Sequence, residues 1–132
     1  MKGVLADTGP LYALLDPSDS RHQRALREAA LADRSGLRVL VCWPTVVETH
    51  RLALHKLGSR VARRWLEEVT SSADLLNPRA EEYSEAASQL RSYEDQRISL
   101  HDSVLAALAR RMVVPVWTYD HHFDLLGASV WR

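Results

Sequence analysis

The stretch Val4-Leu5-Ala6-Asp7-Thr8-Gly9-Pro10 places an acidic residue directly after a short apolar run. A run without a polar position predicts a β-strand that is covered on both faces, as in a parallel sheet. Pro10 favours the first turn of a helix, so the chain is expected to pass from strand to helix around Asp7. This stretch predicts one strand–helix unit of an α/β domain.

The rest of the chain alternates short apolar runs with longer amphipathic stretches. Strands are expected at residues 4–6, 39–42, 74–76, 113–117 and 128–131. Helices are expected at residues 10–15, 20–32, 44–56, 59–70, 79–93, 99–112 and 121–126. Pro115 has no backbone N–H, so the fourth strand is expected to be irregular there. The order of elements predicts an α/β fold with a mostly parallel sheet of four to five strands.

Length and composition narrow the classes of protein further. The 132 residues include 17 Lys and Arg, 17 Asp and Glu, and 46% hydrophobic residues. This length predicts a single domain over residues 1–132. The balanced charge excludes a strongly cationic nucleic-acid coat but allows a local basic patch. No run approaches the ~20 apolar residues of a membrane span, and the single Cys42 cannot form an internal disulfide, so a cytoplasmic protein is expected.

Four acidic residues stand at the ends of predicted elements. Asp7 ends the first strand, Asp120 follows the fourth, and Glu48 and Asp102 lie in the first turns of their helices. Each has an ordinary explanation, because acidic side chains cap the free N–H groups of a helix. Glu48 and Asp102 also stand at capping-box spacing from Thr45 and Ser99. Taken singly, no acid identifies a site.

The joint placement of the acids is more informative. The carboxyl ends of parallel strands meet at the edge of a sheet where ligands bind, and a helix that returns to such a strand begins there too. Four carboxylates converging at this edge would repel one another, and a hard divalent cation such as Mg²⁺ or Mn²⁺ relieves that repulsion. Thr8 and Thr118 lie at the same edge, where they can orient a carboxylate or a water. The sequence predicts a metal site suited to phosphodiester hydrolysis.

Four segments resemble the motifs of PIN-domain ribonucleases. They are VLADTGPLYALLD at residues 4–16, PTVVE at 44–48, ISLHDSVLAA at 98–107 and WTYDHHF at 117–123. They occur in register from about residue 3 to the end of the chain. The resemblance implies a three-layer α/β/α sandwich and Mg²⁺- or Mn²⁺-dependent hydrolysis of single-stranded or looped RNA.

Within that family, small chains of this size resemble the VapC-type toxins of toxin–antitoxin modules. This resemblance implies a homodimer with a cognate antitoxin as partner and RNA as substrate. It also implies that Asp7, Glu48, Asp102 and Asp120 are catalytic and hold the metal, with Thr118 beside the last acid. At most, Asp124 is expected to contact the residues that hold the metal, without binding the metal itself.

A path for RNA is expected next to Glu48. Residues 49–66 contain no acid but five basic side chains, and Arg51 and Arg60 are the candidate RNA contacts. The alternative is a solvated helix face that is paired with the acidic residues after position 80.

The histidines allow a further interpretation. His121 and His122 lie beside Asp120, as in some zinc sites, but their spacing is not that of a closed structural zinc site. His101 faces either the cleft or the solvent, and a solvent-facing position is expected.

Three other functions compete with the nuclease. A phosphoacceptor receiver domain would need a lysine after a late strand, but the only lysines are Lys2 and Lys56. A phosphatase of the haloacid dehalogenase class would need an acid two residues after Asp7, where Gly9 stands. A catalytically silent PIN-like module would bind RNA or a protein, and its RNA affinity would survive EDTA.

Overall fold

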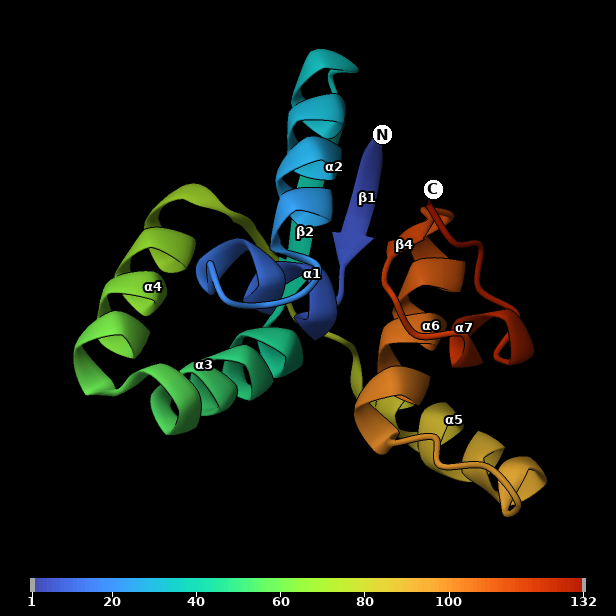
Figure 1. Ribbon diagram of the computed structural model, residues 1–132. Helices are drawn as coiled ribbons and strands as arrows, with labels where there is room; N and C mark the ends of the chain where they lie inside the picture. The colour runs from blue at the N-terminus through green and yellow to red at the C-terminus, as the bar shows by residue number, and fades with distance from the viewer. Residues whose placement is uncertain (1, 132) are drawn as a thin grey trace.

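The computed structural model describes residues 2–131 and has a four-stranded sheet at its centre (Figure 1). The strands are β1 Gly3–Ala6, β2 Arg38–Cys42, β3 Asp74–Leu76 and β4 Val116–Trp117. Their spatial order is β3-β2-β1-β4, and each neighbouring pair is parallel. The predicted α/β fold with a mostly parallel sheet is confirmed.

Helices cover both faces of this sheet. They are α1 Thr8–Leu15, α2 His22–Arg34, α3 Trp43–Leu57, α4 Ser59–Ser72, α5 Ala80–Gln89, the 3₁₀ helix η1 Leu90–Tyr93, α6 Leu100–Met112 and α7 His122–Leu125. Figure 1 shows α5, α6 and α7 to one side of the strands, while α3 and α4 lie to the other. None of the helices in the described part of the chain is both long and apolar enough to cross a membrane.

Alternate residues of the strands contribute to two separate cores. Leu5 and Leu40 pack with Leu105 of α6 and Phe123 of α7 on one face of the sheet. On the other face, Val4, Ala6 and Val41 pack with residues of α1 to α4, including Leu11, Ala25, Val46 and Trp65. Because successive strand residues point to opposite faces, two cores separated by one sheet make three layers. The implied α/β/α sandwich is confirmed.

The C-terminal strands are shorter than expected. Strand β4 begins at Val116 instead of Val113, because Val113 ends α6 in the left-handed conformation (φ 55°, ψ 50°). The expected strand at residues 128–131 is wrong as a strand, since it forms only a single parallel bridge from Val130 to Val116. The sheet therefore has four strands.

The capping expectations have mixed outcomes. Asp7 caps α1 by accepting a hydrogen bond from the N–H of Thr8 at 2.8 Å. Ser99 and Asp102 form the predicted capping box of α6. The capping box expected at Thr45 and Glu48 is wrong: α3 begins at Trp43, directly after β2, and its first turn contains no acid. Glu48 therefore lies in the second turn, where its side chain is not needed as a cap.

Candidate active site

Asp7 lies at the carboxyl edge of the sheet, where β1 passes into α1. Its side chain is almost completely buried, with 6% of the residue exposed. The Thr118 hydroxyl donates to Asp7 Oδ2 at 2.8 Å, and the N–H of Thr8 donates to Oδ1. Thr118 follows β4, which is the parallel neighbour of β1, so the sheet itself places this hydroxyl beside the carboxylate. Both oxygens of Asp7 are therefore fixed in position.

His101 lies among three of the predicted acids. Its Nδ1 is 2.8 Å from Glu48 Oε2, 3.8 Å from Asp102 Oδ1 and 3.9 Å from Asp7 Oδ1. Its Nε2 is 2.8 Å from the hydroxyl oxygen of Thr45, which is fully buried. Only 13% of the His101 side chain is exposed, so the expectation of a solvent-facing histidine is wrong. The structure brings Asp7, Glu48 and Asp102 together around one imidazole.

The electrostatics follow from this arrangement. Burial acts to lower the pKa of His101, but the Asp102, Glu48 and Asp7 carboxylates outweigh it and raise the pKa to about 9. The imidazole is therefore positively charged at neutral pH. Burial raises the pKa of Asp7 to about 6, although the Thr118 hydroxyl and His101 act to lower it. Asp7 is thus a carboxylate whose negative charge is incompletely compensated.

Asp102 lies beside them in the first turn of α6. Its Oδ2 accepts a hydrogen bond from the N–H of Ser99 at 3.1 Å, and its N–H donates to Ser99 Oγ. Burial acts to raise the pKa of Asp102, but the interactions with His101 and Ser99 together outweigh it and lower the pKa below its ordinary value. The capping box thus holds an ionised carboxylate at the site.

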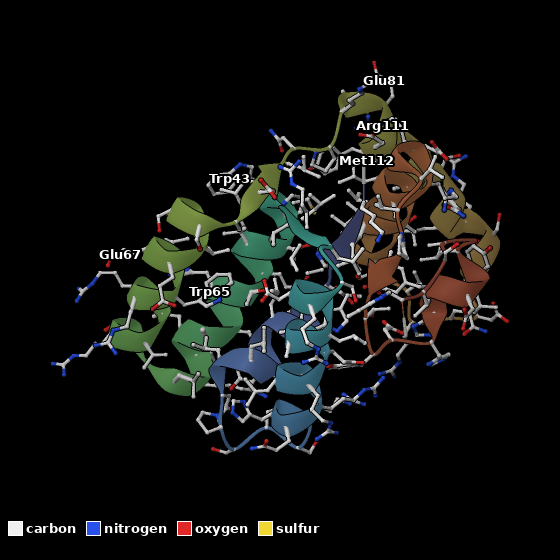
Figure 2. All side chains as sticks on the ribbon, turned by 90° about the horizontal axis from the view of Figure 1, so that it is seen from above. Trp43, Trp65, Glu67, Glu81, Arg111 and Met112 are labelled. Carbon is white, nitrogen blue, oxygen red and sulfur yellow. The ribbon has the colours of Figure 1, made fainter. Side chains whose placement is uncertain are left out.

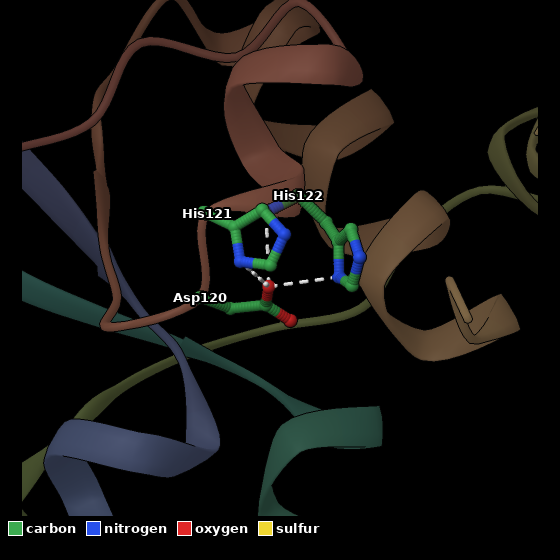
Figure 3. Close-up of side chains that lie close together, drawn as sticks. All are labelled: Asp120, His121 and His122. Atoms are coloured by element: carbon green, nitrogen blue, oxygen red, sulfur yellow. Dashed lines mark hydrogen bonds and ion pairs between the residues drawn. The ribbon is translucent and has the colours of Figure 1, made fainter. Parts of the chain in front are cut away.

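Asp120 is connected to Asp7 through one hydroxyl. Its N–H donates to Thr118 Oγ1 at 3.0 Å, and the same hydroxyl donates to Asp7. Its carboxylate, however, faces a separate cluster with His121 and His122 (Figure 3). Asp120 Oδ1 lies 2.9 Å from His122 Nδ1 and 4.0 Å from His121 Nδ1. The four acids therefore form a group of three with Asp120 as a neighbour.

The donor set fits a hard divalent cation. Ligand atoms of Asp7, His101 and Asp102 lie within 4.8 Å of one another. Carboxylate oxygens are the ligands that Mg²⁺ and Mn²⁺ prefer. Burial raises the pKa of Asp7 even though His101 lies 3.9 Å away, so a bound cation would stabilise the ionised carboxylate. The side chains present are therefore able to hold the ion that the sequence predicts.

The remaining predicted residues lie at different distances from this group. Thr8 has a buried hydroxyl oxygen without a hydrogen-bond partner among the described residues, as expected of a group that can face a ligand. Arg51 and Glu48 line one shallow depression of about 340 Å³ on α3. Arg60 is exposed at the start of α4, and Asp124 is exposed on α7. No described contact joins Arg60 to the three acids.

The contact between His101 and Thr45 could not be predicted from either segment alone. Their contact joins residues that are 56 positions apart, and the helix that carries each of them shows only cap-like residues nearby. The available signal was indirect: three converging acids require a positive charge, and His101 directly precedes Asp102.

The chain belongs to the PIN-domain family, whose model matches residues 4–128. The matched range contains Thr118 and all four predicted acids. No protein of curated function matches the chain significantly in sequence.

Solved structures of other proteins share the whole fold. VapC20 of Mycobacterium tuberculosis, a toxin that cleaves the sarcin–ricin loop, has a TM-score of 0.85 at 22% identity, covering 98% of this chain and 99% of VapC20. VapBC2 of Rickettsia felis, solved bound to a DNA fragment from its promoter, has a TM-score of 0.74 at 11% identity, covering 98% and 96%. FitAcB of Neisseria gonorrhoeae has a TM-score of 0.69 at 20% identity, covering 98% and 96%.

Proposed function

We propose that this protein is a metal-dependent endoribonuclease, the toxin of a VapBC-type toxin–antitoxin module, formed by one PIN-like domain over residues 1–132. The observation that carries the proposal is the group of three carboxylates, Asp7, Glu48 and Asp102, around a charged imidazole at the carboxyl edge of a parallel sheet. Family membership and the fold shared with VapC20 support this reaction class.

Asp7, Glu48 and Asp102, with Asp120 beside them, would hold Mg²⁺ or Mn²⁺. Such an ion supplies positive charge to the phosphodiester and makes an attacking water more acidic. The choice between Mg²⁺ and Mn²⁺ belongs to this proposal, because carboxylate oxygens suit both ions.

The chain's own residues position the reacting groups. Thr118 fixes the rotation of the Asp7 carboxylate and connects it to the backbone of Asp120. Ser99 holds Asp102 in the same way through the capping box. His101 compensates the negative charge of the acids, while its two ring nitrogens are held by Glu48 and Thr45. Because these positions are fixed before RNA binds, little reorganisation is needed during the reaction.

The proposal includes partners. Two of the similar structures, VapBC2 and a FitAB complex solved on a DNA fragment, are complexes of two components, which supports a cognate antitoxin for this chain. We also expect a homodimer and a cytoplasmic location. Arg51 lies next to Glu48 and is the nearest proposed RNA contact, while Arg60 would contact a phosphate further along the strand.

The test is cleavage of a panel of structured RNAs by purified protein in Mg²⁺, in Mn²⁺ and in EDTA. Asp7→Asn and Asp102→Asn, purified identically, should give no fragments. The control is Glu67→Gln on the outer side of α4, which removes a carboxylate far from the site and should cleave like the wild type (Figure 2).

Two results would contradict the proposed nuclease activity. Cleavage that is unchanged in Asp7→Asn would identify a contaminating ribonuclease. RNA affinity that persists in EDTA, with no fragments from any RNA, would favour the catalytically silent binding module.

A further inference from the structure

An apolar pocket of about 450 Å³ lies directly beside the acidic site. Its apolar lining comes from three helices: Trp43, Pro44 and Val47 of α3, Tyr83 of α5, and Leu100 and Val104 of α6. It is formed where residues from the N-terminal parts of α3 and α6 come together with Tyr83 of α5.

The apolar side chains of this pocket are unusually open to solvent. Val47 is 65% exposed, Leu100 46%, Trp43 40% and Tyr83 38%. In Figure 2, Trp43 lies on the outside of the molecule. Large apolar side chains that gather on a surface typically mark a place where a ligand or partner binds.

The pocket and the acidic site share two residues. Glu48 and His101 line the pocket, and they are also the pair whose side chains lie 2.8 Å apart in the acidic group. A molecule in the pocket therefore contacts the residues of the proposed reaction. No Lys or Arg lines the pocket, so it is not built to bind phosphate itself.

We propose that this pocket binds an unpaired nucleobase of the RNA, next to the phosphodiester that is cleaved; this inference rests on the proposed nuclease function. A nucleobase is flat and uncharged, and it stacks on aromatic rings such as those of Trp43 and Tyr83. The phosphate of the same nucleotide would then lie toward Glu48 and His101. Stacking accepts every base, so the pocket selects RNA whose bases are unpaired rather than one particular base.

A protein that fills the pocket would cover Glu48 and His101 and so exclude RNA from the site. An antitoxin segment in the pocket would therefore compete with RNA. The pocket is assigned to the substrate because its two aromatic rings and its position beside the acids match a nucleobase and its phosphate.

The experiment measures binding and cleavage of one unstructured RNA oligonucleotide. Binding is measured by fluorescence anisotropy in an Asp7→Asn background, so that it does not depend on cleavage. Trp43→Ala and Tyr83→Ala should each raise Kd by at least about fivefold, the lower range for loss of one stacked base. Trp43→Phe keeps a ring and should restore most of the affinity.

The matched control is Leu31→Ala. Leu31 lies on α2 and is 43% exposed, but it belongs neither to the pocket nor to the proposed RNA path, so its Kd should be unchanged. An RNA with abasic sites in place of its bases should bind the wild type and Trp43→Ala equally. In the cleavage assay, Trp43→Ala should raise KM and leave kcat nearly unchanged.

Three outcomes would contradict the proposal that this pocket binds a nucleobase. The first is equal Kd for the wild type, Trp43→Ala and Tyr83→Ala. The second is a shift from dimer to monomer in Trp43→Ala by light scattering, which would assign the surface to a second copy. The third is loss of antitoxin binding without loss of RNA affinity. Failure of the proposed nuclease activity can be distinguished from failure of the pocket proposal. In the first case the wild type would cleave no RNA, while the anisotropy assay would still measure binding to the pocket.

Discussion

Asp7 combines a structural and a chemical task in one side chain. It caps α1, and it is buried at the point where β1 and β4 bring Thr118 beside it. A cap stabilises the fold, whereas a buried charge with a raised pKa destabilises it. Which contribution is larger can be measured by replacing the carboxylate with an amide of nearly the same shape.

Asp7→Asn should abolish cleavage and increase the free energy of unfolding at pH 7 by up to about 3 kcal/mol. Burial raises the pKa of Asp7 to about 6, so the charged form is held at a cost that the amide avoids. Urea unfolding in EDTA gives the stability, and RNA cleavage gives the activity. A variant that is clearly less stable than the wild type would show that capping is the larger contribution.

His101 should make the metal-free protein sensitive to alkaline pH. Its pKa is raised to about 9 in the fold, so its stabilisation is complete below the unfolded value near 6.5 and is lost as the pH rises through 9. Urea unfolding in EDTA should show a loss of up to about 3 kcal/mol between pH 6.5 and 9.5 relative to His101→Gln. Parallel pH profiles of the two proteins would contradict the charged imidazole.

Basic side chains at different positions should affect RNA binding differently. Arg51→Ala with Arg60→Ala should reduce the slope of log Kd against log salt by about 1.4, since each contact with single-stranded RNA contributes about 0.7. Arg34→Ala, at the exposed end of α2, is the control and should leave the slope unchanged. An unchanged slope in the double variant would remove residues 51–60 from the RNA path.

At the scale of elements, the end of α6 shows a local conflict between sequence and conformation. Val113 has φ 55° and is 87% exposed, although β-branched residues are unfavourable in the left-handed region. Its side chain adds little packing to offset this cost. The fold tolerates the conformation because α6 must end there for β4 to pair with β1.

Val113→Gly should raise the free energy of unfolding by about 1 kcal/mol, because glycine adopts this conformation without steric cost. Val113→Ala keeps the Cβ atom and should raise the free energy of unfolding much less. Thermal unfolding of the three proteins provides the comparison. Equal stabilities would mean that the chain relaxes at this position without strain.

Most elements could be predicted from their patterns, and the errors have physical causes. Apolar runs identified β1 and β2, and helical spacing identified α6, because these elements bury whole faces. The residues after Met112 form an equally apolar run, but Val113 is used to end the helix and only Val116 and Trp117 pair. Local hydrophobicity cannot distinguish a paired strand from an apolar connection.

The active site was only partly predictable for a related reason. The acids were found because each one follows a recognisable element boundary. The sequence pattern favours a solvent-facing position for the imidazole that joins them, because its partners Thr45 and Glu48 come from a different helix. A contact between side chains of distant segments leaves no pattern in either segment.

At the scale of the whole molecule, Glu28 connects two layers of the sandwich. It lies on α2 and accepts hydrogen bonds from Trp117 Nε1 of β4 at 3.0 Å and from the hydroxyl of Tyr119 at 2.5 Å. Trp117 is almost fully buried, so its N–H has no access to water. The two donors lie on either side of Thr118, and Glu28 therefore holds the segment that orients Asp7.

Glu28→Ala should lower the free energy of unfolding by about 2 kcal/mol, the cost of leaving a buried donor without a partner. Arg24→Ala is the control: it keeps both hydrogen bonds to Glu28 and removes the exposed ion pair with Glu28 and the guanidinium over the Tyr119 ring, which together should cost about 1 kcal/mol. Urea unfolding measures both. Equal losses would mean that the ion pair, not the buried hydrogen bond, is the important interaction.

The pairing of β1 with β4 has a consequence for the time at which the protein becomes active. Asp7 and Thr118 are 111 positions apart, and the hydroxyl that fixes the first acid is among the last parts of the fold to be translated. A polypeptide still growing on the ribosome has β1 and α1 but no β4 to complete the edge. If the protein has the proposed function, we therefore expect the messenger to be read almost to the end of this domain before the chain is able to cut RNA.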